Sequence, residues 1–176
     1  MKTKGLFVLI LICVACSKNE ARRPLNPKPS TTLLSETVDH SKALNEIEVQ
    51  KIEDYIANDS LQTYEVSKSG FWYSYQKKVY NNASVPVLGD EVIFEYQISD
   101  LYGNPIYTKE ELGLKKYLVD KEDFISALQK GIKLMKVGET VIFVIPSYHA
   151  FGISGDGNKI GMNQTIKSTV TLLKIK

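Results

Sequence analysis

The hydrophobic positions of this chain recur at a helical spacing near the N-terminus and at a strand-like spacing through most of the remainder. In the segment Ser35–Asn58, apolar side chains recur about every third or fourth residue, with charged side chains between them. The apolar positions are Leu44, Ile47, Ile52, Tyr55 and Ile56. This stripe predicts an amphipathic helix over residues 35–60, which either packs on its own domain or serves as a dimer or partner contact.

Alternation of apolar and polar residues predicts strands after this helix. Val92, Phe94, Tyr96 and Ile98 share one face of a strand predicted at residues 91–100. The aromatic run at residues 71–80 is also typical of a strand. Further short strands are predicted at residues 63–68, 106–108, 115–119, 140–145 and 165–175.

A single helix interrupts these strands late in the chain. Phe124 and Leu128 lie on one face of a helix predicted within residues 121–138. Asp120 is a candidate N-cap, and Gly131 is a candidate stop position. Many strands with one inserted helix predict an α+β fold, in which an antiparallel sheet curves over the helix.

The N-terminus has the pattern of a secretory signal over residues 1–15. Two lysines precede an apolar run at residues 6–12, which is far shorter than the about 20 residues of a membrane-spanning helix. Ala15 directly before Cys16 is typical of a bacterial lipoprotein processing box. We therefore expect Cys16 to become an acylated N-terminus; an ordinary cleaved signal peptide is the alternative.

The residues after this signal narrow the classes of function. Prolines at positions 24, 27 and 29 predict an extended tether over residues 16–34. No cysteine follows Cys16, so the mature chain has no disulfide framework. Lys2 and Lys4 account for the formal charge of +2, and the remaining 20 basic side chains balance the 20 acidic ones. This balance gives no electrostatic argument for nucleic-acid binding.

Five short stretches follow one another in a distinctive order, at residues 69–73, 89–96, 134–139, 145–152 and 169–173. The fourth reads Ile-Pro-Ser-Tyr-His-Ala-Phe-Gly. Together they resemble the FKBP-type peptidyl-prolyl isomerase family over residues 61–176, with its core at residues 86–176. With Ala21-Arg22-Arg23-Pro24 behind Cys16, the whole chain also looks similar to the lipoproteins of Bacteroidetes that are associated with gliding motility.

The chemistry that this resemblance implies needs no nucleophile, metal or cofactor. Rotation about an X–Pro bond faces a barrier of about 18–20 kcal/mol, because the amide loses resonance when it twists. An apolar cradle that holds the proline ring and favours the twisted amide is sufficient. His40 and His149 lie far apart with no cysteine or paired acid beside them, so we expect neither to be catalytic.

The resemblance also implies which residues form this cradle. Tyr96 stands at the cradle tyrosine, Ile125 at the residue whose backbone N–H holds the substrate carbonyl, and Phe151 at a second tyrosine. The further predicted substrate-binding residues are Ile106, Tyr107, Phe124, Leu128, Ile160 and Ser168. Each of these side chains could equally be ordinary buried core.

Several of these positions depart from the family pattern. Ile106-Tyr107 replaces a Phe-Asp pair, and Leu128 replaces a tryptophan that forms the floor of the cradle. Ser168 and Lys115 each replace an aromatic residue. Because an indole buries far more area than an isobutyl group, we expect a wider, shallower and wetter cradle.

Two functions follow as hypotheses. The first is an envelope lipoprotein that isomerises X–Pro bonds of client polypeptides, anchored to a bilayer through Cys16. Residues 17–20 lack the acidic run expected of surface-exported lipoproteins, which favours the periplasmic side of the outer membrane. The second is a weakly active or inactive FKBP fold that binds peptides or assembles an envelope complex. A lipid-carrying role is disfavoured, because so few strands leave little room for a ligand cavity.

Overall fold

The computed structural model describes residues 31–80 and 82–176. The chain divides into two compact units, residues 1–38 and 39–176, and the second unit contains all the strands described here. The predicted signal peptide, Cys16 and most of the predicted tether lie outside the described residues. Within those residues, no helix is both long enough and apolar enough to cross a membrane.

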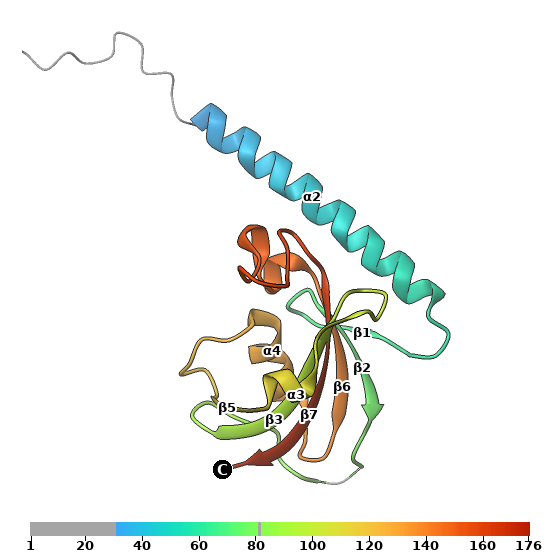
Figure 1. Ribbon diagram of the computed structural model, residues 1–176, viewed down its shortest axis with the longest axis vertical. Coiled ribbons are helices and arrows are strands. Elements are labelled where there is room, and N and C mark those ends of the chain that lie inside the picture. Colours follow the sequence, from blue (N-terminus) through green and yellow to red (C-terminus); the bar gives the residue numbers. More distant parts are fainter. Residues whose placement is uncertain (1–30, 81) are drawn as a thin grey trace, which may run out of the picture. The chain divides into compact units, whose positions relative to one another are not determined.

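Seven strands of the described chain form one antiparallel sheet (Figure 1). Their order is β1-β2-β6-β7-β3-β4, and β5 pairs with β3. The bounds are β1 Glu65–Val66, β2 Trp72–Lys77, β3 Glu91–Ser99, β4 Pro105–Tyr107, β5 Leu114–Leu118, β6 Thr140–Ile145 and β7 Ile166–Ile175. The predicted α+β class with an antiparallel sheet is confirmed.

Strand β3 organises the sheet because it pairs with three other strands. One of its edges follows β7, and the other pairs first with β5 and then with β4. The short helix α3 (Lys109–Leu112) lies between β4 and β5 in the sequence. The Thr108 hydroxyl caps α3 by accepting the Glu111 N–H, and the Glu111 carboxylate accepts the Thr108 N–H. These two bonds form a capping box, whose pattern is visible in the sequence.

The late helix is much shorter than its predicted span of residues 121–138. Helix α4 covers Ser126–Gly131 and continues as the 3-10 turn η1 (Ile132–Leu134). Asp120 is not its N-cap, because its φ of 56° places it in a turn and Ile125 occupies the cap position. Gly131 does not end the helix through a positive φ; it has φ −65° and lies where a Cβ would be 2.5 Å from the Phe143 ring.

Alternate side chains of the sheet enter two hydrophobic cores. The larger core joins one face of the sheet to α4, and it includes Phe94, Leu128 and Phe143. The smaller core joins the other face to helix α2 (Thr31–Asn58) through Ile52, Trp72, Leu101 and Val144. The neighbours Phe143 and Val144 on β6 therefore point to opposite cores, as the pleat of a strand requires.

Helix α2 is longer than predicted. It begins at Thr31 instead of Ser35, so the last four residues assigned to the tether are helical. Ile52 is fully buried, whereas Leu44 and Ile47 are exposed. The predicted stripe therefore packs on the molecule's own domain at Ile52 and leaves its earlier part uncovered in this chain.

Candidate functional site

Four aromatic rings on the α4 side of the sheet form the centre of the candidate site. Phe94 and Tyr96 both point from β3 toward Phe124, with ring centroids 5.7 and 5.6 Å from its ring. Tyr117 of β5 lies 5.9 Å from the same ring. Phe94 and Tyr117 are buried, while Tyr96 and Phe124 keep part of their surface exposed. An apolar ligand ring would meet the exposed parts of Tyr96 and Phe124 first.

Ile125 lies at the entrance of α4, directly after Phe124. It occupies the N-cap position with φ −53° and ψ 117°, and its side chain is 8% exposed. Backbone N–H groups at the start of a helix are not used by the helix itself. This position suits the predicted role of the Ile125 N–H as a donor to a substrate carbonyl.

The segment between β6 and β7, residues 146–165, supplies two more predicted residues of the cradle. Phe151 packs half-buried against the larger core, and Ile160 is 3% exposed within that core. Two 3-10 turns shape the segment, η2 (Ser147–His149) and η3 (Gly152–Ser154). We call residues 146–165 the β6–β7 loop.

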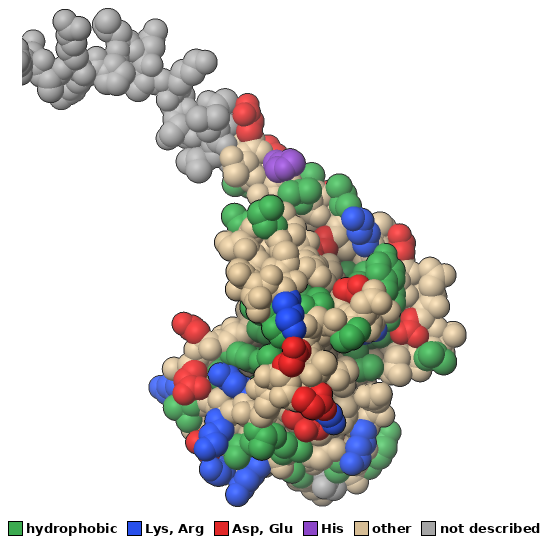
Figure 2. Space-filling model, viewed as in Figure 1, with side chains coloured by type: hydrophobic (Ala, Val, Ile, Leu, Met, Phe, Trp, Pro, Cys, Tyr) green, Lys and Arg blue, Asp and Glu red, His purple; other side chains and the backbone are tan. Residues whose placement is uncertain are grey.

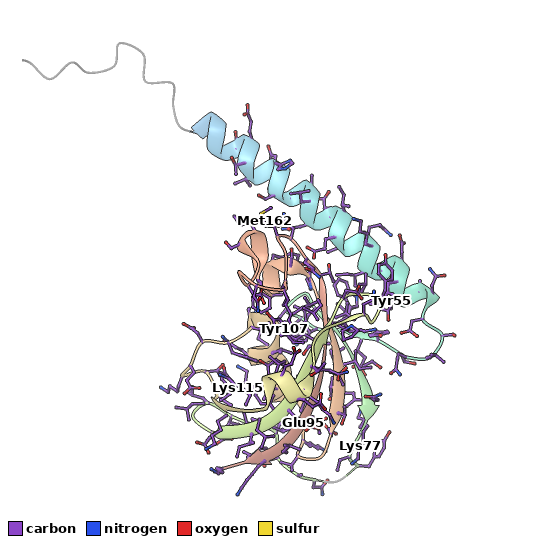
Figure 3. The ribbon with its side chains drawn as sticks, viewed as in Figure 1. Tyr55, Lys77, Glu95, Tyr107, Lys115 and Met162 are labelled. Atoms are coloured by element: carbon purple, nitrogen blue, oxygen red, sulfur yellow. The ribbon has the colours of Figure 1, made fainter. Side chains whose placement is uncertain are left out.

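A tyrosine–carboxylate pair connects β4 to the β6–β7 loop. The Tyr107 hydroxyl, labelled in Figure 3, donates to Oδ2 of Asp156 over 2.5 Å, and Nδ2 of Asn158 donates to the Tyr107 oxygen over 3.0 Å. The ammonium of Lys159 lies 4.8 Å from the centre of the Tyr107 ring. Tyr107 therefore offers a hydroxyl that binds an aspartate from the loop.

Asp156 is held as a carboxylate by its hydrogen bonds. Its Oδ1 accepts the backbone N–H groups of Asn158 and Ile160, each over 2.8 Å. Burial opposes ionisation of this group, but the bonds from Tyr107 and these two N–H groups outweigh it and lower the pKa of the Asp156 carboxyl. Burial alone raises the pKa of the Tyr96 hydroxyl, which stays neutral at physiological pH.

Leu128 and Ser168 are both fully buried. Each is 0% exposed, and the Ser168 hydroxyl donates to the backbone oxygen of Gln97 over 3.2 Å. Their contact with a substrate stays a prediction. Lys115 covers the edge of the cradle, with its ammonium 5.4 Å from the centre of the Phe124 ring. Ile106 packs half-buried against the same core.

A hollow on the other face of the sheet contains none of the predicted site residues. Its volume is about 640 Å³, and Tyr55, Tyr64, Tyr102 and Ile142 are among its lining residues. Two of its polar pairs bond within the lining, because Lys167 donates to Tyr55 and Tyr64 donates to Asp59. This hollow is therefore separate from the cradle.

The polar surface of the described residues gives no sign of a metal centre. Across residues 31–80 and 82–176, no group of three or more His, Cys, Asp or Glu side chains is arranged to hold a metal ion. Acidic and basic side chains both occur on the face drawn in Figure 2. The candidate site is therefore an aromatic and aliphatic cradle with one tyrosine–carboxylate pair.

Sequence reasoning missed two residues at this site, Asp156 and Glu48. Asp156 stands between two glycines and has the pattern of an ordinary turn residue. Glu48 lies about 100 residues away from its partners in the loop, Ser147 and Thr165. For Asp156, the one hint in the sequence is that position 107 lacks an acid, which another residue could then supply. For Glu48, the sequence holds no such hint.

The sequence model described as FKBP-type peptidyl-prolyl cis-trans isomerase matches residues 82–173, just over half of the chain. This span contains every residue of the cradle described above.

Two solved structures are similar in fold. The crystal structure of FkpA from Escherichia coli has a TM-score of 0.62 and 19% sequence identity, covering 100% of this chain and 83% of that chain. A peptidyl-prolyl cis-trans isomerase from Pseudomonas syringae pv. tomato has a TM-score of 0.59 and 16% identity, covering 74% of this chain and 95% of that chain. At these identities the likeness concerns the fold alone.

Proposed function

Since this chain belongs to the FKBP-type peptidyl-prolyl cis-trans isomerase family, we propose that it acts as an envelope lipoprotein that isomerises X–Pro bonds in client polypeptides as a folding helper. The observation that carries the catalytic part is the partly exposed Tyr96–Phe124 pair, bordered by Ile125 and Phe151. We take proline-containing polypeptides as its substrates.

The cradle favours the twisted amide through its apolar surroundings. The planar amide is polar and well hydrated, and it loses part of this polarity when resonance is lost. Aromatic walls at Tyr96, Phe124 and Phe151 exclude water from the proline ring and so disfavour the planar form more than the twisted one. A donor at the Ile125 N–H fixes the carbonyl on one side of the bond. No covalent intermediate is required.

The Tyr107–Asp156 pair gives the cradle a carboxylate where the sequence alone lacked one. Asp156 approaches from the loop, and Tyr107 orients it from the strand. We assign to this pair the role that the aspartate following the strand phenylalanine has in the family. The cradle therefore keeps a polar edge despite the substitution at position 107.

The alternative function is a catalytically weak or inactive binding module. The observation that favours this alternative is that Leu128 and Ser168 are fully buried. With leucine at position 128, the cradle has no tryptophan floor. In this alternative, the exposed side chains Leu44 and Ile47 on α2 would form a dimer or partner contact. Replacing both by serine would then harm function in cells more than Tyr96→Ala does.

The cellular part of the proposal rests on sequence outside the described residues. Acylation of Cys16 would anchor the chain to a bilayer, with the periplasmic side of the outer membrane as its location. The resemblance of residues 21–24 supports a role in gliding motility machinery. Labelling with a radioactive fatty acid in wild type and Cys16→Ser tests the anchor, and protease shaving of whole cells tests the side of the membrane.

Measurement of X–Pro exchange tests the catalytic proposal. The full chain, purified in detergent, is compared with the double variant Tyr96→Ala, Phe151→Ala on a short Leu-Pro peptide. Tyr80→Ala is the matched control, because this tyrosine is 90% exposed and lies outside the cradle. We expect the double variant to lose most of the activity and Tyr80→Ala to retain it. Equal rates for wild type and double variant would reject catalysis at this cradle.

A further inference from the structure

Glu48 of α2 binds both ends of the β6–β7 loop. Its carboxylate accepts the backbone N–H of Ser147 over 2.6 Å, the Ser147 hydroxyl over 2.7 Å and the Thr165 hydroxyl over 2.5 Å. Hydrogen bonds to an ionised acceptor are shorter and stronger than neutral ones. Three such bonds at one side chain form a tight connection between α2 and the loop.

The two partners stand where the loop leaves and rejoins the sheet. Ser147 follows the end of β6 by two residues, and Thr165 directly precedes β7. Ile145 and Ile166 are paired across these strands, so the base of the loop is narrow. Glu48 therefore fixes the base, while the Tyr107–Asp156 bond fixes the loop further along.

The interior of the loop has further ties to the rest of the domain. Lys159 forms an ion pair with Glu111 of α3, and Ile160 is buried in the larger core. Bonds within the loop join Asn163 to Gly152 and Asp156 to Ile160, while Ile153 and Met162 are each 75% exposed at its surface. The orientation of Phe151 and Asp156 over the cradle thus depends in part on the attachments at Glu48 and at Tyr107.

We propose that Glu48 is a positioning residue for the proline site: its carboxylate sets the base of the β6–β7 loop, and through it the placement of Phe151 and Asp156. This inference rests on the proposed isomerase function. It gives α2 a role in the site, although α2 lies outside the segment that matches the family. A neutral or shorter side chain cannot accept all three bonds at once, so the loop base would lose its fixed position.

Stability and positioning can be separated, because α2 has a second anchor. Ile52, one turn after Glu48, is fully buried in the smaller core with Trp72 and Val144. Ile52→Ala should therefore lower the melting temperature while kcat, measured well below that temperature, is retained. Glu48→Ala should do the reverse and act mainly on kcat.

The test compares the full chain in detergent with Glu48→Ala, Glu48→Gln and the control Glu46→Ala, an exposed acid on the same helix. X–Pro exchange is followed by NMR, so that no protease contacts the variants. We expect kcat of Glu48→Ala to fall about tenfold with little change in KM, because small displacements in a site act on the transition state. Glu48→Gln should be intermediate, and Glu46→Ala should equal wild type.

Amide hydrogen exchange of residues 151–163 supplies a readout that does not depend on turnover. Faster exchange in this segment for Glu48→Ala, with unchanged exchange in β3, supports the proposal. If amide exchange of the loop and kcat are both unchanged in Glu48→Ala, the proposal is overturned. The same holds if only the melting temperature falls while loop exchange and kcat stay at wild-type values. If the wild type shows no isomerase activity, the proposed function fails, and loop exchange together with binding of the Leu-Pro peptide decides the role of Glu48.

Discussion

Gly131 fixes how closely helix α4 approaches the sheet, and its replacement by alanine tests this part of the fold. A Cβ at this position would lie 2.5 Å from Cε1 and 2.9 Å from Cζ of Phe143. Real Cβ atoms do not approach other carbon atoms this closely, so either the helix or the ring must move. Phe143 is fully buried and packs edge-on against Phe71, with centroids 5.9 Å apart, which leaves the ring little room.

The expected free-energy cost is the difference of two opposing effects. Inserting a methyl group into a well-packed core destabilises by about 1–3 kcal/mol. Alanine is favoured over glycine inside a helix by about 0.5–1 kcal/mol, and Gly131 has ordinary helical dihedral angles. We therefore expect Gly131→Ala to lower the free energy of unfolding by about 1–2 kcal/mol, which lowers the melting temperature by about 2–4 °C per kcal/mol.

Urea unfolding and thermal melting of the full chain measure this effect. Gly161→Ala is the matched control, because a Cβ there would meet only Oε1 of Gln164 at an ordinary 3.5 Å. Shortening the partner should relieve the clash, so Gly131→Ala combined with Phe143→Leu should cost less than the sum of the two single changes. A Gly131→Ala variant as stable as wild type would refute the reasoning that this glycine is required for space.

Three further outcomes follow from the described contacts. Asp156→Asn should lower kcat/KM several-fold, and Tyr107→Phe combined with it should add little, because both remove one bond between loop and strand. Burial and the nearby Lys130 lower the pKa of His149 below 6.5, so the unfolded chain binds the proton more readily than the folded one. The melting temperature should therefore fall as the pH drops below about 6.5. This fall should be smaller in His149→Asn. Glu139→Ala should cost about 2–4 kcal/mol in urea unfolding, because this 2% exposed carboxylate accepts the N–H groups of Val79 and Lys136.

Most of the sheet could be predicted from alternation. Strand β6 has the predicted bounds, and β3 differs by one residue at its end. The late helix could not be predicted correctly from the same kind of pattern. Phe124 has helical spacing to Leu128, yet its ring packs against Tyr96 and Tyr117. This packing holds residues 121–125 outside the helix, which begins at Ser126. Tertiary packing outweighed a local periodicity.

The candidate site divides in the same way. Resemblance assigned Tyr96, Phe124, Ile125 and Phe151 to one place, and the structure brings them around one core. The resemblance could not predict how exposed each side chain is, because the same leucine or serine in the sequence is compatible with an exposed or a buried position. Leu128 is buried because it lies on the face of α4 that packs into the larger core. Gly131, which none of the five motif stretches includes, permits the close approach of α4 to Phe143 of the sheet.

The missing aspartate at position 107 illustrates why a motif departure does not by itself indicate lost function. A comparison of position 107 alone indicates that a carboxylate is absent. In the structure a carboxylate reaches this place from the loop, because the Tyr107 hydroxyl of the strand donates to Asp156. This arrangement places a charge at the edge of the cradle but makes its position depend on the loop. A loop that carries the charge needs a fixed base, and the three bonds to Glu48 supply one. The departure at Tyr107 and the connection to α2 are therefore two parts of one arrangement.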